Sequence, residues 1–293
     1  MDLLINSGVH GVILGAAYGI AGVTFGLLYR ISRVFHFAFY AVGVLGAIVA
    51  AQVAGEAESL APILFGVAVG MVVAGVATAV IFLFLYQPLR SHGATSGVAF
   101  IASLGLALVV EAVVAIVAGP ESKSFPVAGF THQSSILGVR VSGLLFASFM
   151  ILLVVSGLAS FFLASSKVGH QIRAIMSSRE QAELVGINVG LLTGLCCFLA
   201  GAASVLAFTI QGMDSSVSFG GAIPLTLFAV LAMLLGGVES IAGTAIAGMG
   251  IGILEGVIAD LVPGQWSSTA VFLIAILLIL YAPNGLFTKR VAR

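Results

Sequence analysis

The chain has 293 residues, of which 60% are hydrophobic and only 8% are charged. Soluble domains carry about 25% charged residues, so this composition excludes a water-soluble fold and places the chain in a lipid bilayer. The 11 basic residues are balanced by 11 acidic ones, which leaves no surplus positive charge for nucleic acid phosphates. We therefore exclude a nucleic-acid partner.

Nine apolar segments are long enough to be membrane-spanning helices. They cover residues 8–28, 34–54, 61–86, 94–118, 142–164, 188–210, 222–238, 241–259 and 267–282. The break at Gly236, Gly237 and Glu239 indicates either a kink or a re-entrant turn, so eight or ten spans also fit. Nine spans of about 20 residues leave too little chain for a sizeable soluble domain. We predict an all-α, polytopic transmembrane helical bundle that forms a single domain over residues 1–293.

The distribution of basic residues predicts the orientation of the chain. The opening segment, MDLLINSGVHG, has neither a basic region nor a cleavage site, so we expect it to be retained. With the N-terminus outside, nine basic residues lie in the cytoplasm and two outside, as the positive-inside rule requires. The nine are Arg30, Arg33, Arg90, Lys167, Arg173, Arg179, Lys289, Arg290 and Arg293, and the two are Lys123 and Arg140. The C-terminus is then cytoplasmic.

Many of the 37 glycines recur at every fourth position, which places them on one face of a helix. The sets are Gly11, Gly15 and Gly19; Gly22 and Gly26; Gly66 and Gly70; Gly190 and Gly194; and Gly248, Gly252 and Gly256. Small residues let helices in a membrane approach closely, so we predict tight helix packing. A pathway lined by these glycines is the alternative, and spacing alone does not separate the two. Cys196 and Cys197 are adjacent in an apolar run and are predicted to pack inside the bundle.

The longest cytoplasmic loop, residues 165–188, has the pattern of two short helices. An apolar face is formed at helical spacing by Val168, Ile172, Ile175 and Met176. Ser178 and Gln181 have the spacing of a capping box, which predicts a second helix that begins at Arg179 and stops before Gly186. Such a helix is suited to docking in a groove of another protein, or to lying on lipid headgroups. The pattern does not decide between these two roles.

Ionisable residues inside the spans are the second functional signal. Glu111 lies past the middle of the fourth span and Glu255 in the outer half of the eighth. A charge near the bilayer centre costs about 2.5 to 3.5 kcal/mol, so such residues are retained for a reason. Each glutamate has three possible roles. It lines a solute path, makes a hydrogen bond between helices, or extends to the outer membrane–water interface.

Basic and aromatic residues gather where the first two spans meet the cytoplasm, as is typical of an interfacial anchor. They are Arg30, Arg33, Phe35, His36, Phe37, Phe39 and Tyr40. His36 has no second ligand at metal-binding spacing, so we expect no metal site. Zinc-protease, serine-hydrolase and phosphate-loop motifs are absent from the sequence. We therefore expect a chain that is not an enzyme and binds no nucleotide itself.

Five segments, in this order, resemble LivH-type permease subunits of ATP-binding-cassette importers for branched-chain amino acids, urea and short amides. They read GLLYRISRVFHFAF, QPLRSHGATSGVAFIASLGLALVVEAVVAIVAGP, VGHQIRAIMSSREQAELVGINV, LLGGVESIAGTAIAGMGIGILE and YAPNGLF. The resemblance runs nearly end to end, and it is specific for the family rather than for the solute.

The resemblance implies a non-catalytic transport subunit in the bacterial inner membrane. It also implies a second, LivM-type permease, a periplasmic solute-binding protein and two cytoplasmic ATPases that bind the ATP and Mg, so no cofactor is expected in this chain. The segment that contacts the ATPase then maps to Gly169, Arg173, Ala174, Arg179, Glu180, Ala182, Gly186 and Ile187. The family pattern favours docking of the 165–188 loop over its lying on lipid.

One segment departs from the family pattern. Family members commonly read Asn-Phe-Ala-His-Gly-Glu where this chain has His36, Phe37, Ala38, Phe39, Tyr40 and Ala41. The change suggests a more apolar or aromatic solute than a typical amino acid. The candidate path residues are His36, Phe37, Tyr40, Glu111 and Glu255. A stand-alone secondary carrier or channel is the alternative, and it would need charged residues near the midplane together with broken helices.

Overall fold

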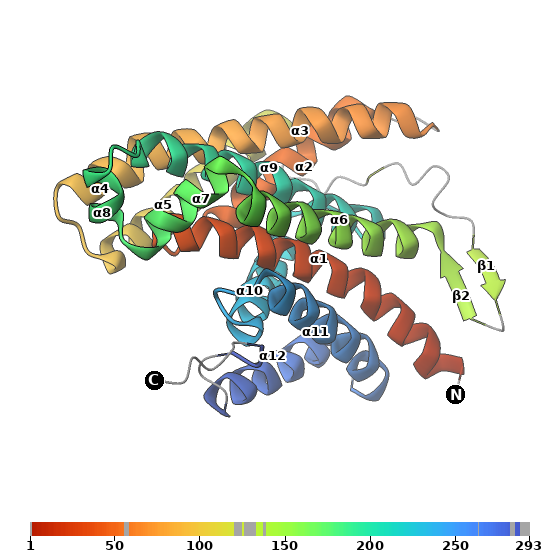
Figure 1. The fold of residues 1–293 in the computed structure, drawn as a ribbon. Helices are drawn as coiled ribbons and strands as arrows, with labels where there is room; N and C mark the ends of the chain where they lie inside the picture. The colour runs from red at the N-terminus through yellow and green to blue at the C-terminus, as the bar shows by residue number, and fades with distance from the viewer. Residues whose placement is uncertain are drawn as a thin grey trace.

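The computed structural model describes residues 2–55, 59–119, 125, 133–136, 139–262, 264–281 and 285–287, and within them the chain is almost entirely helical (Figure 1). The helices are α1 (Asp2–Ser32), α2 (Phe39–Ala54), α3 (Leu60–Ile81), the π-helical turn η1 (Phe82–Tyr86), α4 (Gln87–Ser91), α5 (Ser96–Ala118), α6 (Gly143–Ser165), α7 (Lys167–Ser177), α8 (Arg179–Leu184), α9 (Val189–Asp214), α10 (Phe219–Gly236), α11 (Ile241–Leu261) and α12 (Gly264–Tyr281). Strands β1 (Gln133–Ile136) and β2 (Val139–Ser142) pair antiparallel before α6, a small addition to the predicted bundle.

The apolar helices of the described residues correspond to the nine predicted spans. Seven are long and apolar enough to cross a membrane, namely His10–Ser32, Leu60–Ser91, Ser96–Ala118, Gly143–Ser165, Val189–Asp214, Phe219–Gly236 and Ile241–Leu261. Two shorter apolar helices, Phe39–Ala54 and Trp266–Tyr281, occupy the second and ninth predicted segments. The predicted polytopic, all-α bundle is therefore confirmed.

The largest differences from the predicted span boundaries are in the second and third spans. The second span begins at Phe39 rather than at residue 34, because Arg33 adopts a left-handed backbone (φ 54°) that ends α1 and starts a link over residues 33–38. The third span runs on to Ser91 instead of ending near residue 86. Pro88 is tolerated there because it lies in the first turn of α4, directly after the π-helical turn.

The break near residues 236–241 separates two helices, α10 and α11. Gly237 adopts a left-handed backbone (φ 92°) after α10. The Ser240 side chain then caps α11 by accepting the backbone N–H of Gly243 at 2.9 Å. The open alternative of a kink within one helix is thereby settled in favour of a turn.

Helix α1 lies at the centre of the bundle, between α9 and α6 on one side and α10 and α11 on the other (Figure 1). In its apolar stretch 89% of the residues are buried. The contact with α11 is made by backbone: a Cβ added at Gly11 would lie 2.6 Å from the Gly252 carbonyl oxygen, and one at Gly15 would lie 2.7 Å from that of Met249. The predicted role of these glycines in packing is confirmed.

The same kind of contact joins α2 to α3, but it does not extend to every glycine pair. Gly66 and Gly70 of α3 lie directly against the backbone of α2. For Gly190 and Gly194 the nearest atoms to an added Cβ are 3.5 and 4.0 Å away, which is ordinary contact. Cys196 and Cys197 are fully buried, as predicted. Within the bundle, close backbone approach thus joins α1 to α11 and α2 to α3, and it recurs between α3 and α9 at Gly75 and Gly201.

We predict that Gly252→Ala lowers the stability of the folded chain, whereas Gly250→Ala does not. The added methyl at position 252 would overlap the backbone of Gly15, and such overpacking costs about 1 to 3 kcal/mol. Gly250 lies two residues away, on a different face of the same helix, and an added Cβ there meets nothing within 4 Å. Thermal unfolding of both variants in detergent, followed by size-exclusion chromatography, measures the difference. Equal melting temperatures for the two variants would contradict the close contact of α1 and α11.

Candidate functional site

The predicted coupling loop begins with a sharp turn at Ser166. The Ser166 hydroxyl donates to the carbonyl oxygen of Phe162 at 2.7 Å and accepts the backbone N–H of Gly169 at 2.8 Å. Gly169 is buried, and a Cβ there would overlap the backbone of Phe162 and Leu163. Only glycine therefore lets α7 fold back onto the last turn of α6.

The apolar face of α7 anchors the loop to the bundle. Ile172 and Ile175 are buried, with Val168 and Met176 packed beside them. Their cluster includes Leu27 and Ile31 of α1, Leu163 of α6, and Val189, Leu192 and Cys196 of α9. The predicted amphipathic face is confirmed, and it ties the loop to the ends of three spans.

Helix α8 begins and ends where the sequence predicts. Ser178 accepts the backbone N–H of Gln181 with its side-chain oxygen at 3.4 Å, and Gly186 ends the helix with φ 82°. Arg179 and Glu183 form an ion pair at 3.2 Å along the helix. A backbone hydrogen bond of 3.0 Å from Ile187 to the Ala182 carbonyl closes the turn.

The eight predicted coupling residues differ in their exposure. Arg173, Ala174, Glu180 and Gly186 are exposed, Arg179 and Ile187 are half-buried, and Gly169 and Ala182 are buried. Ala182 packs in the anchoring cluster, so it shapes the loop rather than offering a contact surface. Leu184 and Val185 form the tip instead, with 86% and 75% of their area exposed. Two adjacent apolar residues before the Gly186 stop are the sequence signal for them.

His36 lies in the link between α1 and α2, where it is buried against η1. Its Nδ1 is 2.5 Å from the Tyr86 hydroxyl, while its Nε2 has no partner among the described residues. Burial lowers the pKa of His36, so the imidazole is neutral. Ser103 of α5 accepts the backbone N–H of Phe37 at 3.0 Å and donates to the Phe100 carbonyl at 2.8 Å. These contacts join the link to both α5 and η1.

Three of the predicted path residues lie together where α2 meets α5. The Tyr40 hydroxyl is 3.5 Å from Oε2 of Glu111, and the rings of Phe37 and Tyr40 meet edge to face at 5.6 Å. Phe100 of α5 adds another ring against Phe37. Glu111 is half-buried, and in the described part of the chain no basic side chain pairs with it.

Glu255 lies in a different part of the bundle, among α1, α11 and α12. Its two carboxyl oxygens accept hydrogen bonds from Tyr18 at 2.6 Å and from Ser268 at 2.5 Å, and only 7% of the residue is exposed. This geometry favours the interhelical hydrogen bond over lining of a path. The assignment of Glu255 to the path stays a prediction.

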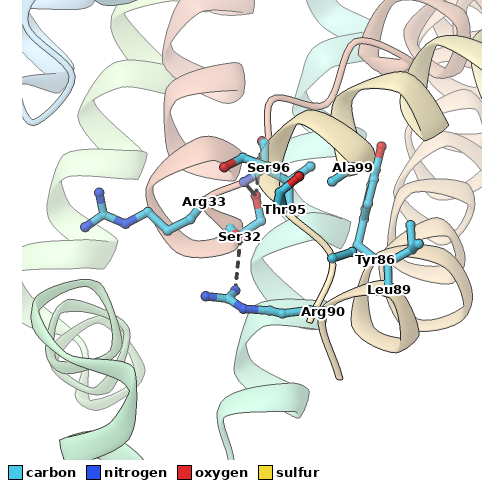
Figure 2. Close-up of a pocket in the computed structure, with 10 residues that line it drawn as sticks. Ser32, Arg33, Tyr86, Leu89, Arg90, Thr95, Ser96 and Ala99 are labelled. Carbon is cyan, nitrogen blue, oxygen red and sulfur yellow. Dashed lines mark hydrogen bonds between the residues drawn. The ribbon is translucent and has the colours of Figure 1, made fainter. Parts of the chain in front are cut away.

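A cavity of about 190 Å³, lined by both polar and apolar residues, lies beside the C-terminal end of α1 (Figure 2). Arg90 reaches across from α4 and donates to the Ser32 carbonyl oxygen at 3.2 Å, and Thr95 and Ser96 come from the start of α5. No group of three metal-binding side chains occurs among the residues that the structure describes. This cavity, the His36 link and the α7–α8 loop all lie at one end of the bundle.

Residues 9–282 match the family described as the permease component of branched-chain amino acid transport systems. The chain belongs to this family. Among curated relatives, BraD, the high-affinity branched-chain amino acid permease of Pseudomonas aeruginosa, is 25% identical over 96% of this chain and 94% of its own length. LivH of Escherichia coli K12 is 24% identical with the same coverage. The solved structure of PsaBC from Streptococcus pneumoniae in complex with Fab aligns with a TM-score of 0.48 at 14% identity, covering 93% of this chain and 89% of that one.

Membership of the permease family makes the chain a multi-pass, non-catalytic transport subunit and confirms the resemblance predicted from the sequence. Sequence reasoning missed Tyr86 and Ser103, the two side chains that bind the permease's 33–38 link. In the sequence, Tyr86 marks only the predicted end of a span, and Ser103 is a lone hydroxyl in an apolar run. Neither has a local pattern that marks it.

Proposed function

We propose that this permease subunit passes a small organic solute inward across the bacterial inner membrane, driven by ATP hydrolysis in partner subunits. The family membership supports transport, and the α7–α8 loop carries the proposal for how it is driven. The partners are a second, LivM-type permease, two cytoplasmic ATPases that bind ATP and Mg, and a periplasmic solute-binding protein. The N-terminus lies outside and the C-terminus in the cytoplasm.

The proposed power stroke begins at the exposed side of the loop. Glu180, Leu184 and Val185 offer one acidic and two apolar side chains to a groove on the ATPase. When the ATPases close, they push on α8, and the buried apolar face of α7 transmits the displacement to the ends of α1, α6 and α9. The bundle then rocks between outward-open and inward-open forms.

The proposed path runs along the side of the bundle where α2 meets α5. Tyr40 and Glu111 supply a hydroxyl and a carboxyl, and Phe37 and Phe100 supply aromatic faces beside them. This combination suits a solute that carries an amino group and an apolar side chain, because a carboxylate and ring faces both attract an ammonium group. The names of BraD and LivH agree with a branched-chain amino acid or a similar amphipathic solute. Urea fits this path less well, because it has no apolar part that would pack against the aromatic rings.

The orientation is tested by thiol labelling. The native cysteines are buried, so single thiols introduced at exposed positions can be read against a low background. We expect Glu180→Cys to react with a membrane-impermeant maleimide only after the cells are permeabilised, and Ser59→Cys to react in intact cells. Labelling of Glu180→Cys in intact cells would place the loop outside and remove the ATPase-docking role.

We predict that Glu180→Arg uncouples ATP hydrolysis from uptake. Reversing an exposed charge at the docking surface places a mismatched charge in the interface and lowers uptake about tenfold, while ATPase activity and the amount of folded complex are kept. Glu180→Gln is the matched control, since it keeps the shape and retains most of the uptake. Ala182→Arg is uninformative, because Ala182 is buried and the variant would misfold. Normal coupled uptake by Glu180→Arg would contradict the docking assignment.

The two membrane glutamates are predicted to respond differently to the same change. Glu111→Gln lowers uptake with little effect on the melting temperature, since its one hydrogen bond among the described residues is long, at 3.5 Å. Glu255→Gln lowers stability by about 1 to 3 kcal/mol, because the amide keeps only one acceptor oxygen and one of the two hydroxyl donors loses its acceptor. Uptake by reconstituted complex and thermal unfolding separate the two effects. Unchanged uptake with Glu111→Gln would contradict the assignment of the path to this side of the bundle.

A further inference from the structure

A second, larger cavity at the same end of the bundle is lined by arginines from separate elements. It has a volume of about 550 Å³ and lies between the end of α1, the end of α7 and the turn from α10 to α11. The lining residues are Tyr29, Arg30, Arg33, Arg173, Met176, Ser177, Val238 and Glu239. Three guanidinium groups face one carboxylate there, so the lining carries a formal surplus of positive charge.

Arg30 is the buried arginine of this cavity. Only 6% of it is exposed, and its Nε donates to the carbonyl oxygen of Val238 in the α10–α11 turn. A guanidinium has five N–H donors, so this bond uses one of them. Among the described residues no carboxylate lies within salt-bridge distance of Arg30, Arg33 or Arg173. Glu239 acts on Arg30 from beyond that distance, and a buried positive charge with no directly paired carboxylate favours an anion from outside the chain.

Arg33 occupies a position where glycine is the usual residue. It follows the last turn of α1 and is the one described non-glycine residue with a left-handed backbone, at φ 54°. An arginine there costs energy that a glycine would not, which points to a role for its side chain. Its Nη2 donates to the Met176 carbonyl at the end of α7 at 2.9 Å. Figure 2 shows the side chain extending away from Tyr86, Thr95 and Ala99 of the smaller cavity.

We propose that this arginine cavity binds a phosphate-bearing anion. Guanidinium groups match phosphate oxygens with paired hydrogen bonds, and a basic pocket at the end of membrane helices is suited to an anionic headgroup. Glu239 is exposed at the cavity and repels a second negative charge. The site therefore favours the single charge of a phosphodiester over the double charge of free phosphate, which makes a lipid headgroup the preferred source.

The bound anion would connect α7, which has few contacts with α1, to the well-packed group formed by α1, α10 and α11. It would bridge the end of α1, α7 of the coupling loop and the α10–α11 turn. Occupancy would then hold α7 in place, next to the surface proposed to receive the ATPases. The site itself follows from the cavity and its charges, so it stands whether or not the proposed transport is correct.

The experiment measures lipid retention by the full-length chain. The protein is purified from bilayers that contain either phosphatidylglycerol or phosphatidylcholine, and bound lipid is counted by native mass spectrometry. In a parallel arm, thermal unfolding is followed with and without inorganic phosphate. The test variant is Arg33→Gly, which removes the charge and suits the left-handed backbone, so it folds. The control is Lys167→Gln, which removes an exposed charge from the start of the same α7 outside the cavity.

We expect the native chain to retain phosphatidylglycerol, and Arg33→Gly to weaken that binding about tenfold. Lys167→Gln should bind as the native chain does, and Glu239→Gln should bind more tightly. Stabilisation by inorganic phosphate that Arg33→Gly abolishes would support the same site with free phosphate as its source. Retention of neither anion, or equal retention by Arg33→Gly and the native chain, would overturn the proposal.

Discussion

The close contact between the backbones of α1 and α11 is the constraint on which the rest of the bundle depends. Hydrocarbon gives helices no hydrophobic reward for association, so packing has to come from short-range contact and hydrogen bonds. Glycines on both helices bring main-chain atoms together where any side chain would hold them apart. This contact fixes α1 at the centre, with its C-terminal end packed beside α7. The anchor of the coupling loop and the arginine cavity both use that end of α1.

Two different interactions connect the loop to α1. One is the apolar cluster in which Ile172 and Ile175 meet Leu27 and Ile31, which is non-directional and tolerates sliding. The other is the hydrogen bond from Arg33 to Met176, which is directional and fixes one relative position. A loop held by the first alone would transmit force poorly, because its helices would slip. An occupant of the arginine cavity would add further directional bonds at the same junction.

Local sequence patterns predict most of the helices. The side-chain contacts of the candidate site join residues far apart in the sequence, so most of them could not be predicted. Apolar runs, glycine spacing and the cap at Ser178 each act within a few residues, so the spans, α7 and α8 were predictable. The bond between Tyr18 and Glu255 joins residues 237 positions apart, and no single sequence reveals such a pair. Ala182, which the family resemblance places among the coupling residues, is buried, and a six-residue helix is too short for its periodicity to show this from the sequence. Its part in coupling stays a prediction.

The two membrane glutamates show how partners decide the role of a residue type. Each carboxyl lies within a span, yet a solute approaching Glu255 would have to displace two short hydrogen bonds inside a buried cluster. At Glu111 it would displace one contact of 3.5 Å on a half-buried side chain. Helix α5, which carries Glu111, is also poorly covered by the rest of the chain, with 17% of its apolar stretch buried. A second permease packed against α5 would cover the open side of Glu111 and leave a path between the two subunits. A stand-alone carrier would instead have to form the whole path from its own helices.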